Sequence, residues 1–412
     1  MLLAGGPGPC AASACSAGDP ACPRSGSVVC WGDAPLQDTG AYLPAAADVG
    51  AGSAGSNSTQ LLLLDTDLAS SSLAAENSFA CGLADGGTSV ACWGSGLLPE
   101  LTAAAAGVGQ AGQLVAAVPT GDTVNPAVKL VTGDSFVCAL LADHTLECLG
   151  SIGGIEWGNV DGSSSGSSSS PLAPVLEAPG GAPAQFVDVA AGAQHVCGVL
   201  TNGLIACFGS NEDNQLGPPF ETLANSTIPV LAGDATLAFT AVAAGDAFSC
   251  GLLANGTAVC WGGFADNSEE QLLPPGLRAV ADYTFASLAA KRATLCGVTE
   301  DSGDLVCAGV ISSFIGADGY PAQVFSEEPV VIDMLHDYTA VSVGGSGFYF
   351  HACGLEAGGA ALCWGLDNED QLGVQTSSKL GNVAAMTPTA VDTSLRFSSI
   401  AAGGAFTCAV VA

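Results

Sequence analysis

The chain has 412 residues, with only 7 lysines and arginines against 39 aspartates and glutamates, which gives a formal net charge of −32. Such a chain repels nucleic acids and anionic membrane leaflets, because binding to either depends on lysine and arginine. The composition therefore excludes a nucleic-acid binder and favours a basic or neutral protein or peptide partner.

The apolar residues, 49% of the chain, are not gathered in any run that approaches the ~20 residues needed to cross a membrane. The first residues lack the basic start and the apolar segment of a convincing signal peptide. Residues 1–21 are expected to form a tail with Cys10 and Cys15. Together with Cys22 these cysteines could hold zinc, although their spacing is poor for such a site. Their pairing is left open.

After the tail, the chain begins with half of a unit that then recurs to its end. Residues 27–32 close with Cys30-Trp31-Gly32, which is the second half of that unit. Copies with two cysteines, 10 or 11 residues apart, follow in chain order: Cys81 and Cys92, Cys138 and Cys148, Cys197 and Cys207, Cys250 and Cys260, Cys296 and Cys307, Cys353 and Cys363.

The final copy stops halfway and contains only the first of the two cysteines, Cys408. The first cysteine of the unit thus occurs seven times, at intervals of 46 to 59 residues. A unit of about fifty residues has the size of one propeller blade. We therefore predict an all-β fold over residues 22–412: a seven-bladed β-propeller of four-stranded antiparallel blades.

Each cysteine pair is expected to lie on the two strands of one β-hairpin. A turn such as Ala254-Asn255-Gly256 suits a three-residue loop whose last residue is left-handed. With the loop centred on Asn255, Cys250 and Cys260 lie directly opposite each other. Such a pair is within disulfide reach. The alternative is that the cysteines are small buried apolar residues with free thiols.

The two ends of the chain supply complementary halves of one blade. Cys30 lacks a good upstream hairpin partner and Cys408 lacks a downstream one, so a Cys30–Cys408 bond would close the ring in one blade and leave no exposed sheet edge. A local Cys22–Cys30 pair competes with it. The total of 17 cysteines is odd, so at least one thiol is free or joined to another chain.

Low-complexity segments separate some of the units. Residues 161–170 have the composition of a flexible Ser/Gly-rich linker and are expected to loop out. Three Asn-x-Ser/Thr tripeptides begin at Asn57, Asn225 and Asn255. They are glycosylation acceptors if the chain is secreted, and all three are expected in loops or turns.

Several short motifs recur in the same order. Val-Ala-Ala-Gly precedes Cys-Gly-Val or Cys-Gly-Leu, a turn follows, and then come Cys-Trp-Gly and Asn-x-x-x-Gln-Leu-Gly. The fullest copies of the last segment are residues 210–217 and 366–373, with a partial copy at Asn267 and Gln271. This pattern resembles the regulator of chromosome condensation repeat, whose members form seven-bladed propellers. The paired cysteines make it similar to the extracellular version in plant Crinkly-type receptor kinases.

The acidic residues of those two loops are the candidate binding residues for a basic partner: Glu212, Asp213, Glu369 and Asp370. They could instead hold calcium through hard oxygens, or simply cap a turn. His195 and His351 stand two residues before a cysteine and are interpreted as structural. No catalytic motif is present, so neither an enzyme nor a cofactor is expected.

The sequence thus predicts a non-enzymatic extracellular or cell-surface binding or scaffold module that recognises a protein or peptide through loops on one propeller face, with a fragment of a receptor ectodomain as one form of it. The alternative, implied by the resemblance, is an intracellular propeller that acts as a small-GTPase exchange factor or adaptor. The founding member binds chromatin, which a net charge of −32 opposes.

Overall fold

The computed structural model describes residues 25–32, 62–64, 72–94, 115–119, 124–157, 173–174, 184–219, 223–232, 236–263, 278–280, 282–315, 321–347, 349–374 and 384–412. The predicted tail, Cys10, Cys15, Cys22, the 161–170 loop, Asn57 and the partial Asn267–Gln271 copy lie outside these residues.

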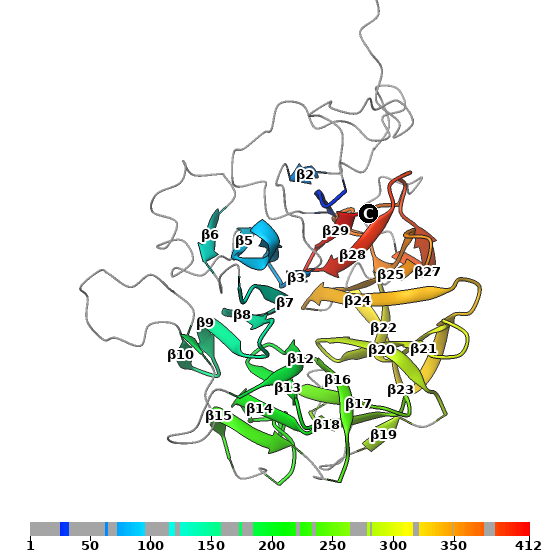
Figure 1. Cartoon of the computed structure of the whole chain (residues 1–412). Coiled ribbons are helices and arrows are strands. Elements are labelled where there is room, and N and C mark those ends of the chain that lie inside the picture. The colour runs from blue at the N-terminus through cyan, green and yellow to red at the C-terminus, as the bar shows by residue number, and fades with distance from the viewer. Residues whose placement is uncertain are drawn as a thin grey trace, which may run out of the picture.

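The described strands form seven antiparallel sheets, which are the blades of a propeller (Figure 1). Blades 1 to 3 follow one another in the chain: blade 1 has β3 (Leu73–Ala75), β4 (Phe79–Ala84), β5 (Ser89–Gly94) and β6 (Val115–Pro119); blade 2 has β7 (Ala127–Gly133), β8 (Phe136–Leu141), β9 (Leu146–Ile152), β10 (Ile155–Trp157) and β11 (Ala173–Pro174); blade 3 has β12 (Phe186–Ala191), β13 (His195–Leu200), β14 (Ile205–Ser210) and β15 (Asn225–Ala232).

Blades 4 to 7 complete the ring: blade 4 has β16 (Phe239–Ala244), β17 (Phe248–Leu253), β18 (Ala258–Gly262) and β19 (Arg278–Val280); blade 5 has β20 (Phe285–Lys291), β21 (Thr294–Thr299), β22 (Leu305–Ile315) and β23 (Pro321–Asp333); blade 6 has β24 (Tyr338–Ser346), β25 (Tyr349–Glu356), β26 (Ala361–Leu366) and β27 (Ala384–Ala390); blade 7 has β28 (Phe397–Ala402), β29 (Phe406–Val411), β1 (Val28–Gly32) and β2 (Leu62–Leu64).

Six blades have the four strands that the sequence predicts, and blade 2 has five, which corrects the prediction for that blade. There the chain turns back at once after β9 to form β10, and the distant β11 pairs with the other end of β9. One short helix, a 3-10 turn over Asp85–Gly87, lies between β4 and β5.

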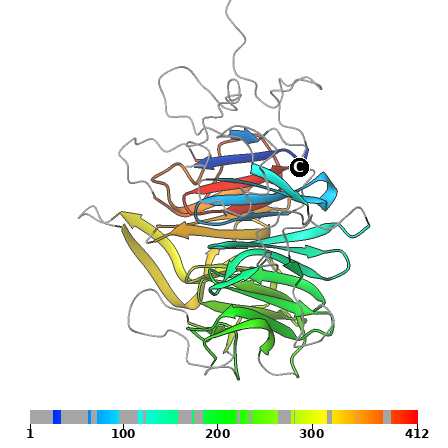
Figure 2. The same ribbon diagram turned by 90° about the vertical axis from the view of Figure 1, so that its left-hand side faces the viewer.

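The first strand of each blade lines the centre of the ring and contacts the first strand of the next blade, including β28 with β3 (Figure 1). Blade 7 joins the two ends of the chain, because β1 pairs with β29 in a register that sets Cys30 opposite Cys408. The predicted ring closure is therefore present, and the strands run across the disc in the edge-on view (Figure 2).

All seven cysteine pairs lie at disulfide-bonding distance, with Sγ–Sγ separations of 2.04–2.13 Å. The two cysteines of each pair lie directly opposite each other on neighbouring strands, as counting from the loop centre at Asn255 predicts for Cys250 and Cys260. The turn itself is as expected, since Gly256 adopts the left-handed φ of +80°. Cys30 lies at bonding distance from Cys408, with an Sγ–Sγ separation of 2.07 Å, which favours this pair over the local Cys22–Cys30 alternative.

The Cys-Gly part of the motif has a steric cause. In blades 3 to 6 the aromatic residue that begins the first strand lies against the glycine that follows the first cysteine of the same blade. A Cβ atom on Gly198 would stand 2.3 Å from the Phe186 ring, and one on Gly251 would stand 2.4 Å from the Phe239 ring. A Cβ atom there would collide with the ring, which explains the glycine in blades 3 to 6; blade 7 departs from the pattern and combines Phe397 with Ala409 after its first cysteine.

Strand order also decides which loops share a face. Because neighbouring strands in a blade are antiparallel, the turn after each first strand and the loop after each third strand emerge on the same side of the disc. We call this side the front face. The hairpin turns between second and third strands, such as the one at Asn255, lie on the back face.

Candidate functional site

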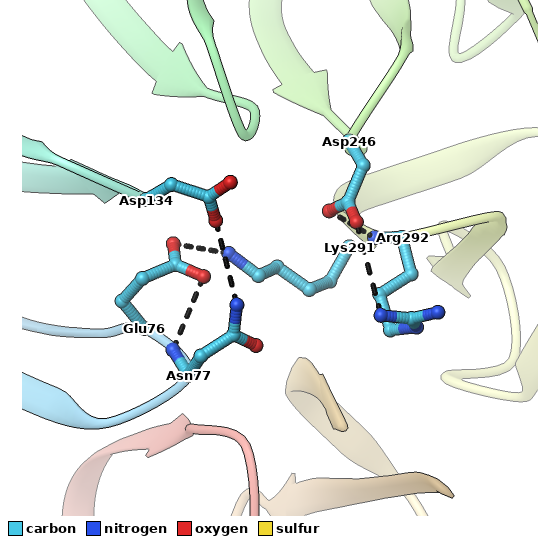
Figure 3. Close-up of polar contacts among 6 residues, drawn as sticks. All are labelled: Glu76, Asn77, Asp134, Asp246, Lys291 and Arg292. Atoms are coloured by element: carbon cyan, nitrogen blue, oxygen red, sulfur yellow. Dashed lines mark hydrogen bonds and ion pairs between the residues drawn. The ribbon is translucent and has the colours of Figure 1, made fainter. Parts of the chain in front are cut away.

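The centre of the front face carries six polar side chains that come from the turns after the first strands of four blades (Figure 3). They point toward one another around the ring axis: Glu76 and Asn77 from blade 1, Asp134 from blade 2, Asp246 from blade 4, Lys291 and Arg292 from blade 5. We call this group the channel cluster.

The middle of the channel cluster is an ion pair between Lys291 Nζ and Glu76 Oε2, which links blade 5 to blade 1 across 215 residues of sequence (Figure 3). Both side chains are buried, with 1% of Glu76 and 8% of Lys291 exposed. Removing one partner of a buried pair leaves the other charge uncompensated, at a cost of about 3–5 kcal/mol. The pair is therefore suited to hold two non-adjacent blades together.

The surrounding charges make the channel cluster acidic. Burial raises the pKa of Glu76 against the opposing effect of Lys291, and the carboxylates of Asp134 and Asp246 add to the rise. Burial works against the charge on Lys291, but Glu76 and Asp246 outweigh it, so the pKa of Lys291 is raised and the ammonium group stays protonated. Three carboxylates thus surround the Lys291 ammonium.

The other members of the channel cluster are fixed locally. The Arg292 backbone N–H donates to Asp246 Oδ1 over 2.9 Å, and its guanidinium lies 3.9 Å from Asp246 Oδ2. Asn77 Nδ2 donates to Asp134 Oδ1 over 3.4 Å. Burial raises the pKa of Asp134, and the negative charge of Asp246 raises it further.

The sequence analysis missed the channel cluster, although a signal for it exists. Glu76 and Lys291 stand five residues before the first cysteine of their blades, where Gly133, Gly192 and Gly245 stand in theirs. A Cβ at Gly192 would lie 2.2 Å from the Gly245 carbonyl oxygen, so glycine is the residue that fits at this position in blade 3, and a charged residue there is a marked departure from the repeat. Glu76 and Lys291 thus carry opposite charges at the same position of the repeat, which marks both as unusual, and the structure shows that they pair across the ring.

The two predicted acidic loops lie on the same face, around the channel cluster. In blade 3 the Ser210 backbone N–H, at the start of the loop, donates over 2.8 Å to the carbonyl of Gln194 in the central turn. The chain then turns sharply at Asn214, which has a left-handed φ of +62°. In blade 6 the same turn is made by Asp370, with a φ of +59°.

Each acidic loop is held by its own polar side chains. In blade 3 the Leu216 and Asp213 backbone N–H groups donate to Asn211 Oδ1 (2.8 Å) and Gln215 Oε1 (2.9 Å). Gln215 therefore stabilises the backbone of an acidic residue.

Blade 6 repeats the arrangement. The Leu372 N–H donates to Asp367 Oδ1 over 2.9 Å, and the Glu369 N–H donates to Gln371 Oε1 over 2.8 Å. The predicted turn-capping role of these loops is thus visible in both copies.

The candidate binding residues divide by exposure. Glu212, Glu369 and Asp370 are exposed and Asp213 is half-buried. Burial raises the pKa of Asp213, and its neighbour Glu212 adds to the rise. The structure therefore places all four on one face, with three carboxylates directly available to a partner.

The predicted glycosylation acceptors in the described residues lie on opposite faces. Asn255 is exposed in the hairpin turn on the back face. Asn225 is also exposed, but the expectation that it lies in a loop is wrong: it begins β15 and pairs with Ser210, because the chain resumes its ladder there directly after the front-face loop.

Both histidines interpreted as structural are fully buried. Burial lowers the pKa of His195 to about 3 and that of His351 to about 4, so both are neutral at ordinary pH. Among the described residues, no group of three His, Cys, Asp or Glu side chains is arranged to hold a metal ion. The same residues include no helix that is long and apolar enough to span a membrane.

Comparison with known proteins matches three segments to the family described as the regulator of chromosome condensation (RCC1) repeat: residues 186–215 and 239–271, and residues 358–410. These segments lie in blades 3, 4, 6 and 7, where the motifs are fullest.

Solved structures share the fold at low identity. Human WBSCR16 is 16% identical with a TM-score of 0.68 over 94% of this chain and 99% of that chain. Prp20p from Saccharomyces cerevisiae, whose binding to Gsp1p and histones has been described, is 16% identical with a TM-score of 0.65 over 94% and 92%. The Crinkly ectodomain of the Arabidopsis thaliana receptor kinase ACR4 is 21% identical, with a TM-score of 0.46 over 82% and 90%.

Proposed function

We propose, from the premise that the chain is a seven-bladed propeller of RCC1 repeats, that it is a non-enzymatic, extracellular binding module that docks a basic protein or peptide on its front face. The observation that supports this proposal most directly is the acidic loop that recurs with the same path in blades 3 and 6 on that face. The loops contribute Glu212, Glu369 and Asp370, and the channel cluster at the centre contributes further carboxylates.

A face with this charge favours a partner rich in lysine and arginine. Acidic loops around an acidic centre produce a field that steers a basic partner and speeds its association. Loops on a rigid scaffold are also where binding residues are usually found. The ring provides that scaffold, since each blade is bonded internally and blade 7 ties the two ends of the chain.

The extracellular location is proposed from the cysteines. Every blade carries one buried pair at bonding distance, and such bonds persist in oxidising compartments but not in the cytosol. The exposed acceptors Asn225 and Asn255 are then available for glycosylation. The second candidate is an intracellular exchange factor or adaptor, which the fold shared with yeast Prp20p favours, and its thiols would be reduced.

Thiol titration of the unreduced, denatured chain separates these two locations. An extracellular protein should show at most three reactive thiols, from Cys10, Cys15 and Cys22, because the other fourteen cysteines are paired. Titration of most of the 17 cysteines in protein isolated from its own cells would overturn the extracellular assignment.

Charge reversal tests the docking face. We expect Glu212→Lys, Asp213→Lys, Glu369→Lys and Asp370→Lys together to slow the association of a short oligolysine peptide at low ionic strength by about tenfold or more. The matched control reverses four exposed carboxylates on the back face, with the same change in net charge: Glu300, Asp301, Asp337 and Asp392. Equal slowing by both variants would mean that net charge, and not the front face, governs binding.

A further inference from the structure

Blades 3 and 6 each begin a buried series of three hydrogen-bonded residues, and the two series have the same form. His195 and His351 occupy the position two residues before the first cysteine. Four other blades have phenylalanine at this position, and blade 5 has Thr294. Both imidazoles reach across the boundary to the next blade, where each meets a hydroxyl group.

The geometry is the same at both boundaries. His195 Nε2 lies 2.9 Å from Ser249 Oγ, which donates to the Gln215 carbonyl over 3.0 Å. His351 Nε2 lies 3.2 Å from Thr407 Oγ1, which donates to the Gln371 carbonyl over 3.0 Å. A hydroxyl group has one proton to donate, and here it donates a hydrogen bond to the carbonyl oxygen. The hydroxyl oxygen therefore accepts a hydrogen bond from the Nε2–H group of the histidine. We call each of these two series of hydrogen-bonded residues a relay.

Each relay ends on the residue that organises an acidic loop. The backbone carbonyl oxygen of Gln215 accepts a hydrogen bond from the Ser249 hydroxyl, and the side-chain oxygen of Gln215 accepts one from the Asp213 backbone N–H. Gln371 does the same with Thr407 and Glu369. The backbone of each acidic residue is therefore connected, through one glutamine, to a fully buried histidine in the core.

At the boundaries where a blade has histidine or phenylalanine two residues before its first cysteine, the residue from that blade is matched in polarity by the residue that faces it from the next blade. Where a blade has histidine, the next blade has Ser249 or Thr407 in the facing position before its first cysteine. Where a blade has phenylalanine, the facing residue is apolar, as in the pairs Phe136 with Val196 and Phe248 with Leu295. Both histidine boundaries coincide with the two full Gln-Leu-Gly loops, so the relay accompanies the loop and is not a requirement of the ring.

We propose that the His195–Ser249–Gln215 and His351–Thr407–Gln371 relays are positioning devices, which fix the acidic loops in the conformation that presents their carboxylates on the front face. The inference rests on the proposed function only for what the loops bind; how the loops are held does not depend on it. Ser249 and Thr407 are buried and would not contact a bound protein or peptide, so they act through the glutamine carbonyl groups.

The test removes one hydroxyl at a time in the full chain. Ser249→Ala should speed amide hydrogen exchange at Asp213 and Leu216 by roughly tenfold and leave Glu369 and Leu372 unchanged. Thr407→Val should do the reverse, so each loop serves as the control for the other. Ser249→Thr, which restores a hydroxyl of the kind blade 7 uses, should return the exchange rates to those of the parent.

A swapped boundary guards against simple loss of folding. His195→Phe with Ser249→Val copies the apolar Phe136–Val196 pairing and should keep the thermal stability while still loosening the blade 3 loop. Unchanged exchange in a folded Ser249→Ala protein, or equal acceleration in both loops, would overturn the proposal.

Oligolysine binding distinguishes the positioning role of the relays from the binding role of the front face. The Ser249→Ala, Thr407→Val double variant should slow association by several-fold. If front-face charge reversal slows association and this double variant does not, the relays do not position the loops for binding. If charge reversal has no effect, the proposed function fails, and the exchange rates alone decide the role of the relays.

Discussion

The two acidic loops follow the same path but begin with different residues, and the difference is chemical. Asn211 uses both ends of its amide: Oδ1 accepts the Leu216 N–H and Nδ2 donates to the Leu223 carbonyl over 2.7 Å. Asp367 in blade 6 accepts the Leu372 N–H with Oδ1, but its Oδ2 has no hydrogen-bond partner among the described residues. Replacement of one NH₂ by oxygen thus turns a neutral cap into a buried charge.

The buried charge makes the blade 6 loop sensitive to pH. Burial raises the pKa of Asp367 from the usual 3.8 to about 6, and Asp370 adds to the rise. Because the folded pKa is above the unfolded one, stability falls as the pH rises from about 4 to 6 and stays lower above that. The equivalent position of the blade 3 loop has no such dependence, because the Asn211 amide does not titrate.

The largest expected effect comes from giving blade 3 the chemistry of blade 6. Asn211→Asp should lower the free energy of unfolding by about 3 kcal/mol above pH 6, because it buries a charge and also removes the donor to the Leu223 carbonyl. Urea unfolding at about pH 7.5 and about pH 4 measures the effect. Only about 1 kcal/mol, from the lost donor, should remain at the lower pH. A loss that is equal at both pH values would contradict the burial of the charge.

The reciprocal change should remove the difference between the loops. Asp367→Asn should raise the free energy of unfolding by about 2 kcal/mol above pH 6 and by almost nothing below about pH 3, where the carboxyl is protonated in both states. The pH dependence of urea unfolding again gives the result. Asp370→Asn, at the exposed left-handed turn of the same loop, is the control and should change stability by less than about 0.5 kcal/mol.

The smallest effect concerns how firmly each loop is fixed. Trp261 Nε1 donates to the Gln215 carbonyl over 3.0 Å, whereas Trp31, its counterpart beside the blade 6 loop, has an Nε1 with no hydrogen-bond partner among the described residues. Both Trp→Phe variants lose similar volume, so Trp261→Phe should cost about 1 kcal/mol more than Trp31→Phe. Equal thermal shifts would mean that the indole hydrogen bond adds nothing to the blade 3 loop.

The sequence predicts much of the architecture because the repeat is local. Cys197 and Cys207 are ten residues apart across a tight turn, so the register follows from counting. The half units at Cys30 and Cys408 likewise predict the closing blade. Asn225 shows the limit of such reasoning: tripeptide composition cannot tell a loop from the first residue of β15, because that depends on where the chain rejoins its ladder.

What the sequence determined by itself was the repeating unit: seven cysteine pairs, hairpins of fixed register, and glycines where an aromatic side chain or a left-handed turn leaves no room. What only the tertiary structure decided was which residues meet when seven such units close into a ring. Glu76 and Lys291 are separated by 215 residues, and His195 and Ser249 belong to different blades. Their contacts depend on the curvature of the ring and on how each blade packs against the next, and no local spacing in the chain encodes those distances.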